Sequence, residues 1–392
     1  MNSLARFACV LGLTAMAASD IALARIKLIS LPVRDRVEMR LDHSSATLVE
    51  EERTVPLTAG VNTVDFSWTN TRVDPNSIVL RIVSDVDAKV LSVSYPPNEQ
   101  ALVWRVSAPA ASSAKVRISY LLGRIQKQYH YRALATNDER SLRLSQYVRL
   151  KNESNENFGP TQIRLDDNLS LERELAHAQT REVLVKRWPA VPVEKTFTAS
   201  LKDFGWFNQA EQKLQVAMHY VVANDAASGL GEFTLPDGKA RIFQADGRGG
   251  NAFLGEDWGK RTVPGDKMRL FLGLSRDIAI KRTVHKNTRQ KIEGNLFNQH
   301  VVLRYEFENF KDTPVTVRLH EHLAEVRRQF LGGKGARMPE WEIGEETTFE
   351  ARPDPDETTI QKVAMSASLP AASNGKAEPV VMLLHLVLKN EW

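Results

Sequence analysis

The feature that most constrains the fold of this chain is a period-two alternation of apolar and polar residues. It recurs in separate segments at residues 116–120, 301–308 and 315–320. Successive side chains of a β-strand point to opposite faces, so such a segment buries one face and exposes the other. An amphipathic helix would repeat every 3.6 residues instead. The alternation therefore predicts an all-β protein built from antiparallel sheets.

Turn signals separate the predicted strands at short intervals. Asp237-Gly238 and Asp246-Gly247 flank the strand-like segment 239–245, and Pro264-Gly265 precedes another at 268–274. Asp-Gly closes tight hairpins because glycine accepts a positive φ. Short strands with frequent turns are typical of β-sandwiches. We expect two or three antiparallel β-sandwich domains, with a short helix over residues 322–331.

The domain boundaries are predicted from composition. Residues 108–114 (APAASSA) have the small side chains of a linker. This places an N-terminal β-sandwich domain at residues 25–114 and a C-terminal β-rich domain at residues 115–392. A sub-boundary of the second domain is expected near residue 205.

The first 24 residues have the pattern of a cleavable signal peptide. Arg6 precedes an apolar run over residues 7–18, and Ala22-Leu23-Ala24 supplies the small-x-small site that signal peptidase accepts. An anchor helix is the alternative, but the run is short for a membrane span. We expect cleavage after Ala24 and a mature chain without a membrane span. Its predicted location is the periplasm or cell surface of a bacterium.

Cys9 is the only cysteine, and it lies within the predicted signal peptide. The mature chain would then have no disulfide, no thiolate metal ligand and no cysteine nucleophile. With a net charge of +4 at pH 7, the expected partners of an exported chain are an envelope protein, an anionic glycan or lipid headgroups. No nucleic-acid-binding motif is found, so nucleic acid is not an expected partner.

An ordered series of motifs runs through most of the mature chain. They are residues 52–66 (ERTVPLTAGVNTVDF), Val73-Asp74-Pro75 with Ser77, 235–243 (LPDGKARIF), Asp246-Gly247, 253–257 (FLGED), 264–266 (PGD), Leu272-Gly273, 277–280 (DIAI), 305–317 (YEFENFKDTPVTV), 321–323 (EHL) and 341–344 (WEIG). The series resembles a bacterial family called domain of unknown function 4139. The resemblance implies an exported, β-rich envelope protein. Some relatives carry the name mucoidy inhibitor, which implies a role in exopolysaccharide or envelope properties. The family supplies no catalytic residue, and its common coiled-coil segment is absent here.

His320 and His322 are the candidate metal ligands. Positions i and i+2 of a strand share a face, so both imidazoles can approach one zinc ion while Glu321 points the opposite way. The sequence reveals no third ligand, and two solvated histidines are the alternative interpretation. No cofactor is predicted.

A basic cluster is the strongest charge feature of the chain. We predict that it forms an exposed loop between two strands, where it contacts lipid headgroups or acidic polysaccharide. A solvated hairpin loop without a ligand is the alternative. The cluster comprises Lys281, Arg282, His285, Lys286, Arg289 and Lys291.

The sequence contains isolated candidates for carbohydrate chemistry but assigns no catalytic residue. Glu256 and Asp257 are candidate glycosidase carboxylates, although neighbours on a strand point to opposite faces. Trp206 and Trp258 are candidate sugar-stacking residues, and the alternative is a place in a sandwich core. A Gly-x-Ser-x-Gly motif is absent. These observations favour a non-enzymatic envelope binding or scaffold module. The alternative is a carbohydrate-active or metal-assisted hydrolase.

Overall fold

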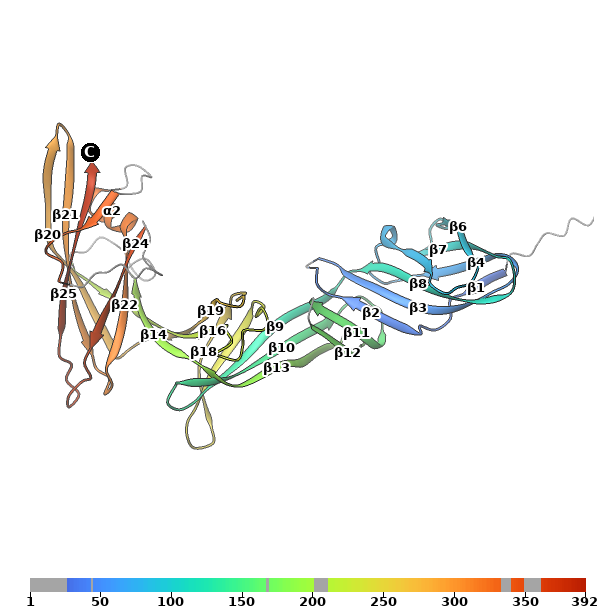
Figure 1. The fold of residues 1–392 in the computed structure, drawn as a ribbon, viewed down its shortest axis with the longest axis horizontal. Coiled ribbons are helices and arrows are strands. Elements are labelled where there is room, and N and C mark those ends of the chain that lie inside the picture. Colours follow the sequence, from blue (N-terminus) through green and yellow to red (C-terminus); the bar gives the residue numbers. More distant parts are fainter. Residues whose placement is uncertain (1–26, 44, 167–168, 201–210, 333–339, 349–360) are drawn as a thin grey trace, which may run out of the picture. The chain divides into compact units, whose positions relative to one another are not determined.

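The computed structural model describes residues 27–392 except for 44, 167–168, 201–210, 333–339 and 349–360. The described residues form five β-sheets, one α-helix and one short 3-10 helix (Figure 1). The predicted all-β sandwich fold is confirmed. The predicted signal peptide, residues 1–24, lies outside the described residues. Among the helices that the structure describes, none is long and apolar enough to cross a membrane.

The chain divides into two compact units. Unit 1 comprises residues 1–126 and 151–180, and unit 2 comprises residues 127–150 and 181–392. The predicted boundary after residue 114 falls inside β8 (Ser112–Leu122), which pairs along its whole length with β3 (Thr47–Leu57). Residues 109–111 only connect two strands of one sandwich, and Ala114 is fully buried. The structure thus moves this boundary, whereas the one predicted near residue 205 lies outside the described residues.

Unit 1 is a sandwich of two sheets. The β4 sheet has the strand order β1-β4-β7-β6, and the β3 sheet has the order β12-β11-β2-β3-β8-β5. Phe66 of the first sheet meets Tyr120 of the second, with ring centroids 5.7 Å apart. The elements of this unit are β1 (Lys27–Ser30), β2 (Arg36–Arg40), β3, β4 (Gly60–Ser67), η1 (Pro75–Ser77), β5 (Val79–Ile82), β6 (Lys89–Ser94), β7 (Ala101–Ala108), β8, β11 (Phe158–Asp166) and β12 (Leu169–Leu175).

Unit 2 contains three sheets around two hydrophobic cores. The β9 sheet (β13-β10-β9-β17-β18) shares one core with β16 and β19. The β14 sheet (β19-β16-β14-β22-β24) and the β21 sheet (β15-β20-β21-β25-β23) enclose the other. Met218 of β16 packs against both cores. These elements are β9 (Ile125–Ala135), β10 (Ser141–Asn152), β13 (Thr180–Pro192), β14 (Glu194–Ser200), β15 (Glu211–Leu214), β16 (Val216–Ala223), β17 (Gly238–Ala245), β18 (Asn251–Gly259), β19 (Lys267–Leu274), β20 (Ile278–Glu293), β21 (Leu296–Asn309), β22 (Val315–His322), α2 (Leu323–Leu331), β23 (Glu340–Ile343), β24 (Lys362–Leu369) and β25 (Val380–Glu391).

The two Asp-Gly signals have different structural roles. Gly247 has φ of 71° and joins the antiparallel strands β17 and β18, as predicted. Gly238 instead begins β17, which pairs in parallel with β9. A Cβ atom at Gly238 would lie 2.5 Å from the carbonyl oxygen of Tyr129. Close backbone approach, not a hairpin turn, therefore requires glycine at this position.

Candidate functional site

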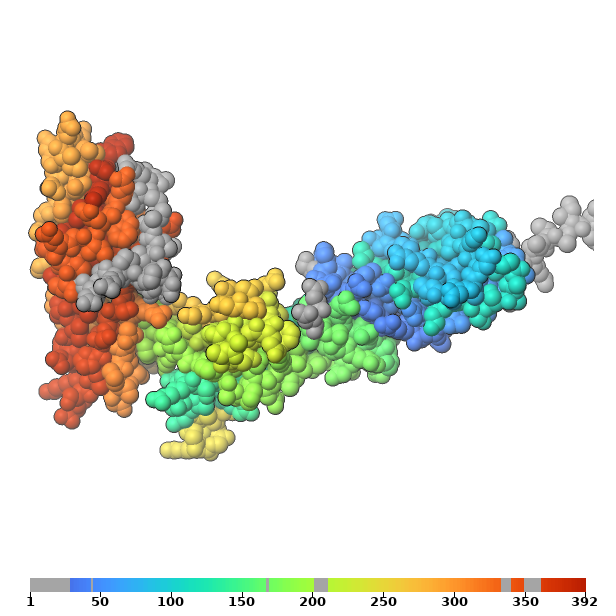
Figure 2. All heavy atoms as spheres, in the orientation of Figure 1, coloured from blue at the N-terminus to red at the C-terminus, as the bar shows by residue number. Residues whose placement is uncertain are grey.

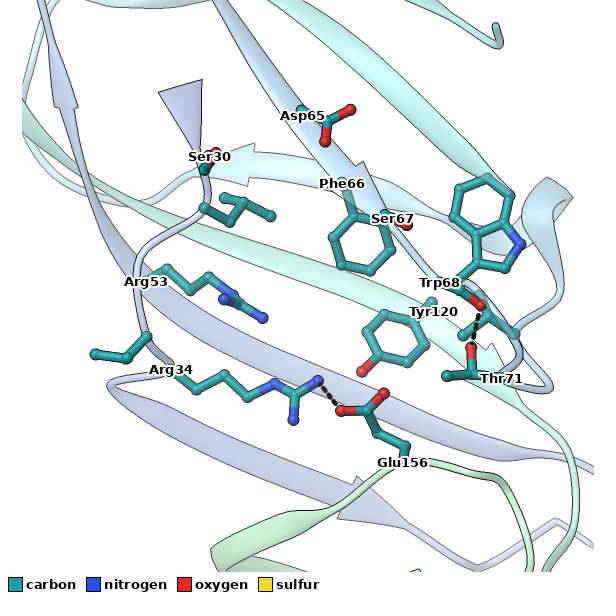
Figure 3. Close-up of a pocket in the computed structure, with 13 residues that line it drawn as sticks. Ser30, Arg34, Arg53, Asp65, Phe66, Ser67, Trp68, Thr71, Tyr120 and Glu156 are labelled. Atoms are coloured by element: carbon teal, nitrogen blue, oxygen red, sulfur yellow. Dashed lines mark hydrogen bonds and ion pairs between the residues drawn. The ribbon is translucent and has the colours of Figure 1, made fainter. Parts of the chain in front are cut away.

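A cavity of about 470 Å³ lies between the two sheets of unit 1. Figure 3 shows the side chains that line it, and we call it the unit 1 pocket. Its walls come from the β1–β2 connection, from β3 and β8 of one sheet, and from β4 with the turn that follows it. Glu156, between β10 and β11, completes the wall. This volume is in the range of small-ligand sites in proteins.

A buried carboxylate organises the polar side of the pocket. The alternation of β3 places Glu51 and Arg53 on the same inward face as Val49 and Val55, and Glu51 is fully buried. Glu51 accepts hydrogen bonds from the Nε atoms of Arg34 and Arg53, the latter at 2.9 Å. Such charge-assisted bonds fix the planes of both guanidinium groups. Glu51 therefore holds two arginines in place at the pocket wall.

The arginines have further protein partners, but these do not use all their donors. Arg34 donates from Nη2 to Glu156 at 2.9 Å and from Nη1 to the carbonyl oxygen of Asn157 at 3.2 Å. Arg53 donates from Nη1 to the carbonyl oxygen of Pro32. A guanidinium group has five N–H donors, so each arginine keeps donors beyond the contacts with described residues. In Figure 3 both guanidinium groups turn toward the space in front of Tyr120 and Phe66.

Aromatic rings form the apolar side of the pocket. Phe66 lies 6.2 Å from Trp68 and 5.7 Å from Tyr120 between ring centroids. Burial raises the pKa of Tyr120, and the charge of Glu51 raises it further. Burial alone would lower the pKa of Arg34, but the charges of Glu51 and Glu156 raise it above its ordinary value. Tyr120 therefore stays a neutral phenol and Arg34 a cation near neutral pH.

Further polar residues line the pocket, and Glu156 is a carboxylate that faces the arginines (Figure 3). Ser30, Asp65, Ser67, Thr71 and Glu156 are among the lining residues, but Asp65 alternates with the inward Phe66 on β4 and its carboxylate points away from the arginines (Figure 3). Among the residues that the structure describes, Asp65 has no ion-pair partner, whereas Glu156 is paired with Arg34. Two arginines thus stand against the carboxylates Glu51 and Glu156. A pocket with this balance suits a polar ligand that both donates and accepts hydrogen bonds.

Sequence reasoning missed this pocket. Residues 52–66 are a predicted family motif only, and no residue of the pocket is among the predicted site residues. One signal is visible in hindsight, because Glu51 and Arg53 occupy inward positions of an alternating strand between Val49 and Val55. Charged residues at inward positions are costly unless they are paired, so they mark a buried polar cluster.

The two candidate metal ligands have different surroundings. His320 is 8% exposed on the outer face of the β14 sheet, and His322 ends β22 just before α2. Glu321 points to the opposite face, as predicted, and lies in the core. The described residues contain no group of three His, Cys, Asp or Glu side chains placed to hold a metal. The metal site stays a prediction without an identified third ligand.

The basic cluster is not a loop. All its residues belong to the long strand β20, because the β20–β21 hairpin turns only at Gly294. Residues 285–293 are all exposed. Arg282 is 1% exposed and donates to Glu321 at 2.8 Å, so it is not a surface group.

The exposed residues 285–293 form the end of the β20–β21 hairpin near Gly294. Figure 2 shows this end of the β20–β21 hairpin at the surface. Lys281 pairs with Glu211 at 2.9 Å, and Lys286 pairs with Glu346 at 2.6 Å. Arg289 lies 4.6 Å from the ring centroid of Phe297. Binding of an anionic ligand by the exposed members stays a prediction, and Arg282 is removed from that set.

The carboxylates considered for hydrolysis have structural partners. A hydrogen bond from Lys239 lowers the pKa of Glu256, which keeps this carboxyl ionised rather than ready to donate a proton. Asp257 accepts from the backbone N–H of Phe271 at 2.7 Å. Trp258 is 48% exposed and so is not a core residue. Trp206 lies outside the described residues.

No protein-family model matches this chain, and no curated protein matches it. The resemblance to the domain of unknown function 4139 family therefore stays a prediction.

Proposed function

We propose that this protein is a non-enzymatic binding module of the bacterial envelope and that the unit 1 pocket binds a saccharide. The observation that carries the proposal is the pair of arginines held at the pocket wall by the buried Glu51. A site whose polar groups are fixed before binding loses little conformational entropy when the ligand arrives.

The chemistry of the lining favours a saccharide over a simple anion. Sugar hydroxyls donate and accept hydrogen bonds, and the pocket offers guanidinium donors beside the carboxylate acceptor Glu156. The apolar faces of a sugar ring suit aromatic walls such as Phe66 and Tyr120. The number of carboxylates near the two arginines disfavours a ligand that carries only negative charge.

The envelope location rests on the sequence. The signal-peptide pattern of residues 1–24 supports export, and the mature chain after that cleavage would contain no cysteine. The resemblance to an envelope family points the same way. Saccharides are abundant in the periplasm and on the cell surface, so this location and the proposed ligand are consistent.

The proposal is tested by measuring saccharide binding to the mature chain. A panel of immobilised neutral and acidic oligosaccharides identifies a ligand, and calorimetry gives its affinity. Glu156→Gln removes an acceptor charge while keeping the shape of the side chain, and we expect it to weaken binding about tenfold. Asp87→Asn, at an exposed site of the same unit outside the pocket, is the matched control. Equal binding by both variants, or no binding across the panel, would contradict the proposal.

A further inference from the structure

Unit 2 has a second cavity of about 380 Å³ on the outer face of the β14 sheet, opposite the hydrophobic core. We call it the β14 cavity. Thr198 of β14 lines it, between Ala217 of β16 and Arg318 of β22 in the strand register. His219 and His320, from the two flanking strands, also line it. Three neighbouring strands thus bring these side chains to one place.

A row of buried hydroxyl groups follows the outer face of β14. Thr196, Thr198 and Ser200 are 4%, 7% and 1% exposed. Within the described part of the chain, none of their side-chain oxygens has a hydrogen-bond partner. Burying a hydroxyl without a partner costs free energy, so a row of them is an unusual feature for a scaffold. Thr198 is among the residues that line the cavity, and its side-chain oxygen is buried without a described partner.

The charged side chains among the described lining residues are all basic. Arg269 and Lys362 join the two histidines, and Phe271 and Ala217 complete the lining. Among the described residues that line the cavity there is no Asp or Glu. This distinguishes it from the unit 1 pocket, whose lining includes Asp65 and Glu156. Cations together with hydroxyl donors are the groups that bind oxyanions.

We propose that the β14 cavity binds a phosphate-type oxyanion, with Arg269 and Lys362 supplying charge and Thr198 donating a hydrogen bond. The inference is independent of the saccharide proposal. The β14 cavity belongs to unit 2, and its described lining contains basic residues but no Asp or Glu. Free phosphate and the phosphate ester of a lipid headgroup share this chemistry, and the experiment separates them.

The first arm of the experiment measures binding of inorganic phosphate to the mature chain by calorimetry in phosphate-free buffer. We expect saturable binding that Thr198→Val and Arg269→Gln each weaken about tenfold. Lys267→Gln is the matched control. It removes a positive charge from an exposed position of β19, the strand of Arg269, outside the cavity lining. Unchanged binding by Thr198→Val, or an equal loss in Lys267→Gln, would overturn the proposal.

A second readout separates loss of binding from loss of folding. Without phosphate, Thr198→Val should raise the unfolding temperature, because it removes a buried hydroxyl that lacks a described partner. Phosphate should raise the unfolding temperature of the wild type but not of this variant. A variant that is destabilised and still stabilised by phosphate would contradict the assignment of Thr198.

The second arm uses vesicles of phosphatidylcholine with and without phosphatidic acid. Adsorption that requires phosphatidic acid and is competed by inorganic phosphate assigns the lipid headgroup as the source. Binding of inorganic phosphate without vesicle adsorption assigns the free ion. Absence of both kinds of binding overturns the proposal.

Discussion

Each unit buries a glutamate beside an arginine and a tyrosine, but only the cluster of unit 1 lines one of the two cavities described above. In unit 1, Glu51 is bonded to Arg34 and Arg53 near Tyr120. In unit 2, Glu321 accepts from Arg282 and from the hydroxyl of Tyr305. Both glutamates are at most 1% exposed. A buried glutamate with an arginine and a tyrosine nearby therefore occurs in both units.

The clusters differ in how far solvent reaches the arginine. The side chain of Arg34 is 21% exposed and lines the unit 1 pocket, whereas that of Arg282 is 1% exposed. Gln329 of α2 accepts from Arg282 Nη1 at 3.1 Å, so the helix helps to close this cluster. Burial raises the pKa of Tyr305, which keeps the phenol protonated as a donor to Glu321. A buried ion cluster thus serves the scaffold in unit 2 and presents donors to a cavity in unit 1.

The largest expected effect comes from breaking the closed cluster. Arg282→Met leaves the Glu321 carboxylate buried without its cation, and we expect unit 2 to lose about 3–5 kcal/mol of unfolding free energy. Chemical denaturation followed by circular dichroism measures this loss. Adding Glu321→Leu to the same chain should recover much of it, because an apolar pair avoids the cost of burying charge. A loss below about 1 kcal/mol would show that the cluster is not structurally important.

A smaller loss of stability is expected in unit 1. Glu51→Gln should lower the unfolding free energy by about 2 kcal/mol, because the partly exposed Arg34 still has Glu156 and solvent as partners. The same change should also weaken saccharide binding, since it releases both arginines. Glu50→Gln, on the opposite face of β3, is the control and should change stability by less than about 0.5 kcal/mol. Equal effects of the two variants would contradict the conclusion that Glu51, on the inward face of β3, stabilises unit 1 more than Glu50 does.

Acidification should destabilise unit 2 through a histidine pair. Burial, followed by the nearby His300, lowers the pKa of His385 below its ordinary value of 6.5. The unfolded chain then binds a proton more readily than the folded chain, so stability is retained above pH 6.5 and falls as the pH drops from there toward the lowered pKa. Thermal unfolding between about pH 7.5 and 5 should show this slope, and His385→Gln should reduce it. His43→Gln, at an exposed site, should leave the slope unchanged.

The smallest effect is expected at an exposed ion pair. Lys281 and Glu211 are 41% and 54% exposed, so Lys281→Gln should change the unfolding free energy by less than about 0.5 kcal/mol. Denaturation in low and high salt provides the measurement. A loss of stability comparable to that of Arg282→Met would contradict the expectation that an exposed ion pair contributes less than a buried one.

The fold was largely predictable from local patterns. The alternation at residues 301–308 corresponds to β21, and the helix expected at residues 322–331 is α2. Alternation identifies the face on which a side chain lies, but it does not identify the partner that the side chain meets. Arg282 was therefore predicted to be exposed, although its partner Glu321 lies 39 residues away. The unit 1 pocket was missed for the same reason, because Arg34 and Glu156 are 122 residues apart in the chain.

The most direct test of the central proposal is to locate a bound saccharide on the mature chain by nuclear magnetic resonance. With a saccharide identified from the panel, the account predicts changes at the side-chain N–H signals of Arg34, Arg53 and Trp68, and none at the indole N–H of Trp341 in unit 2. Changes confined to unit 2, or unchanged signals from all three pocket residues, would contradict a saccharide site between the sheets of unit 1.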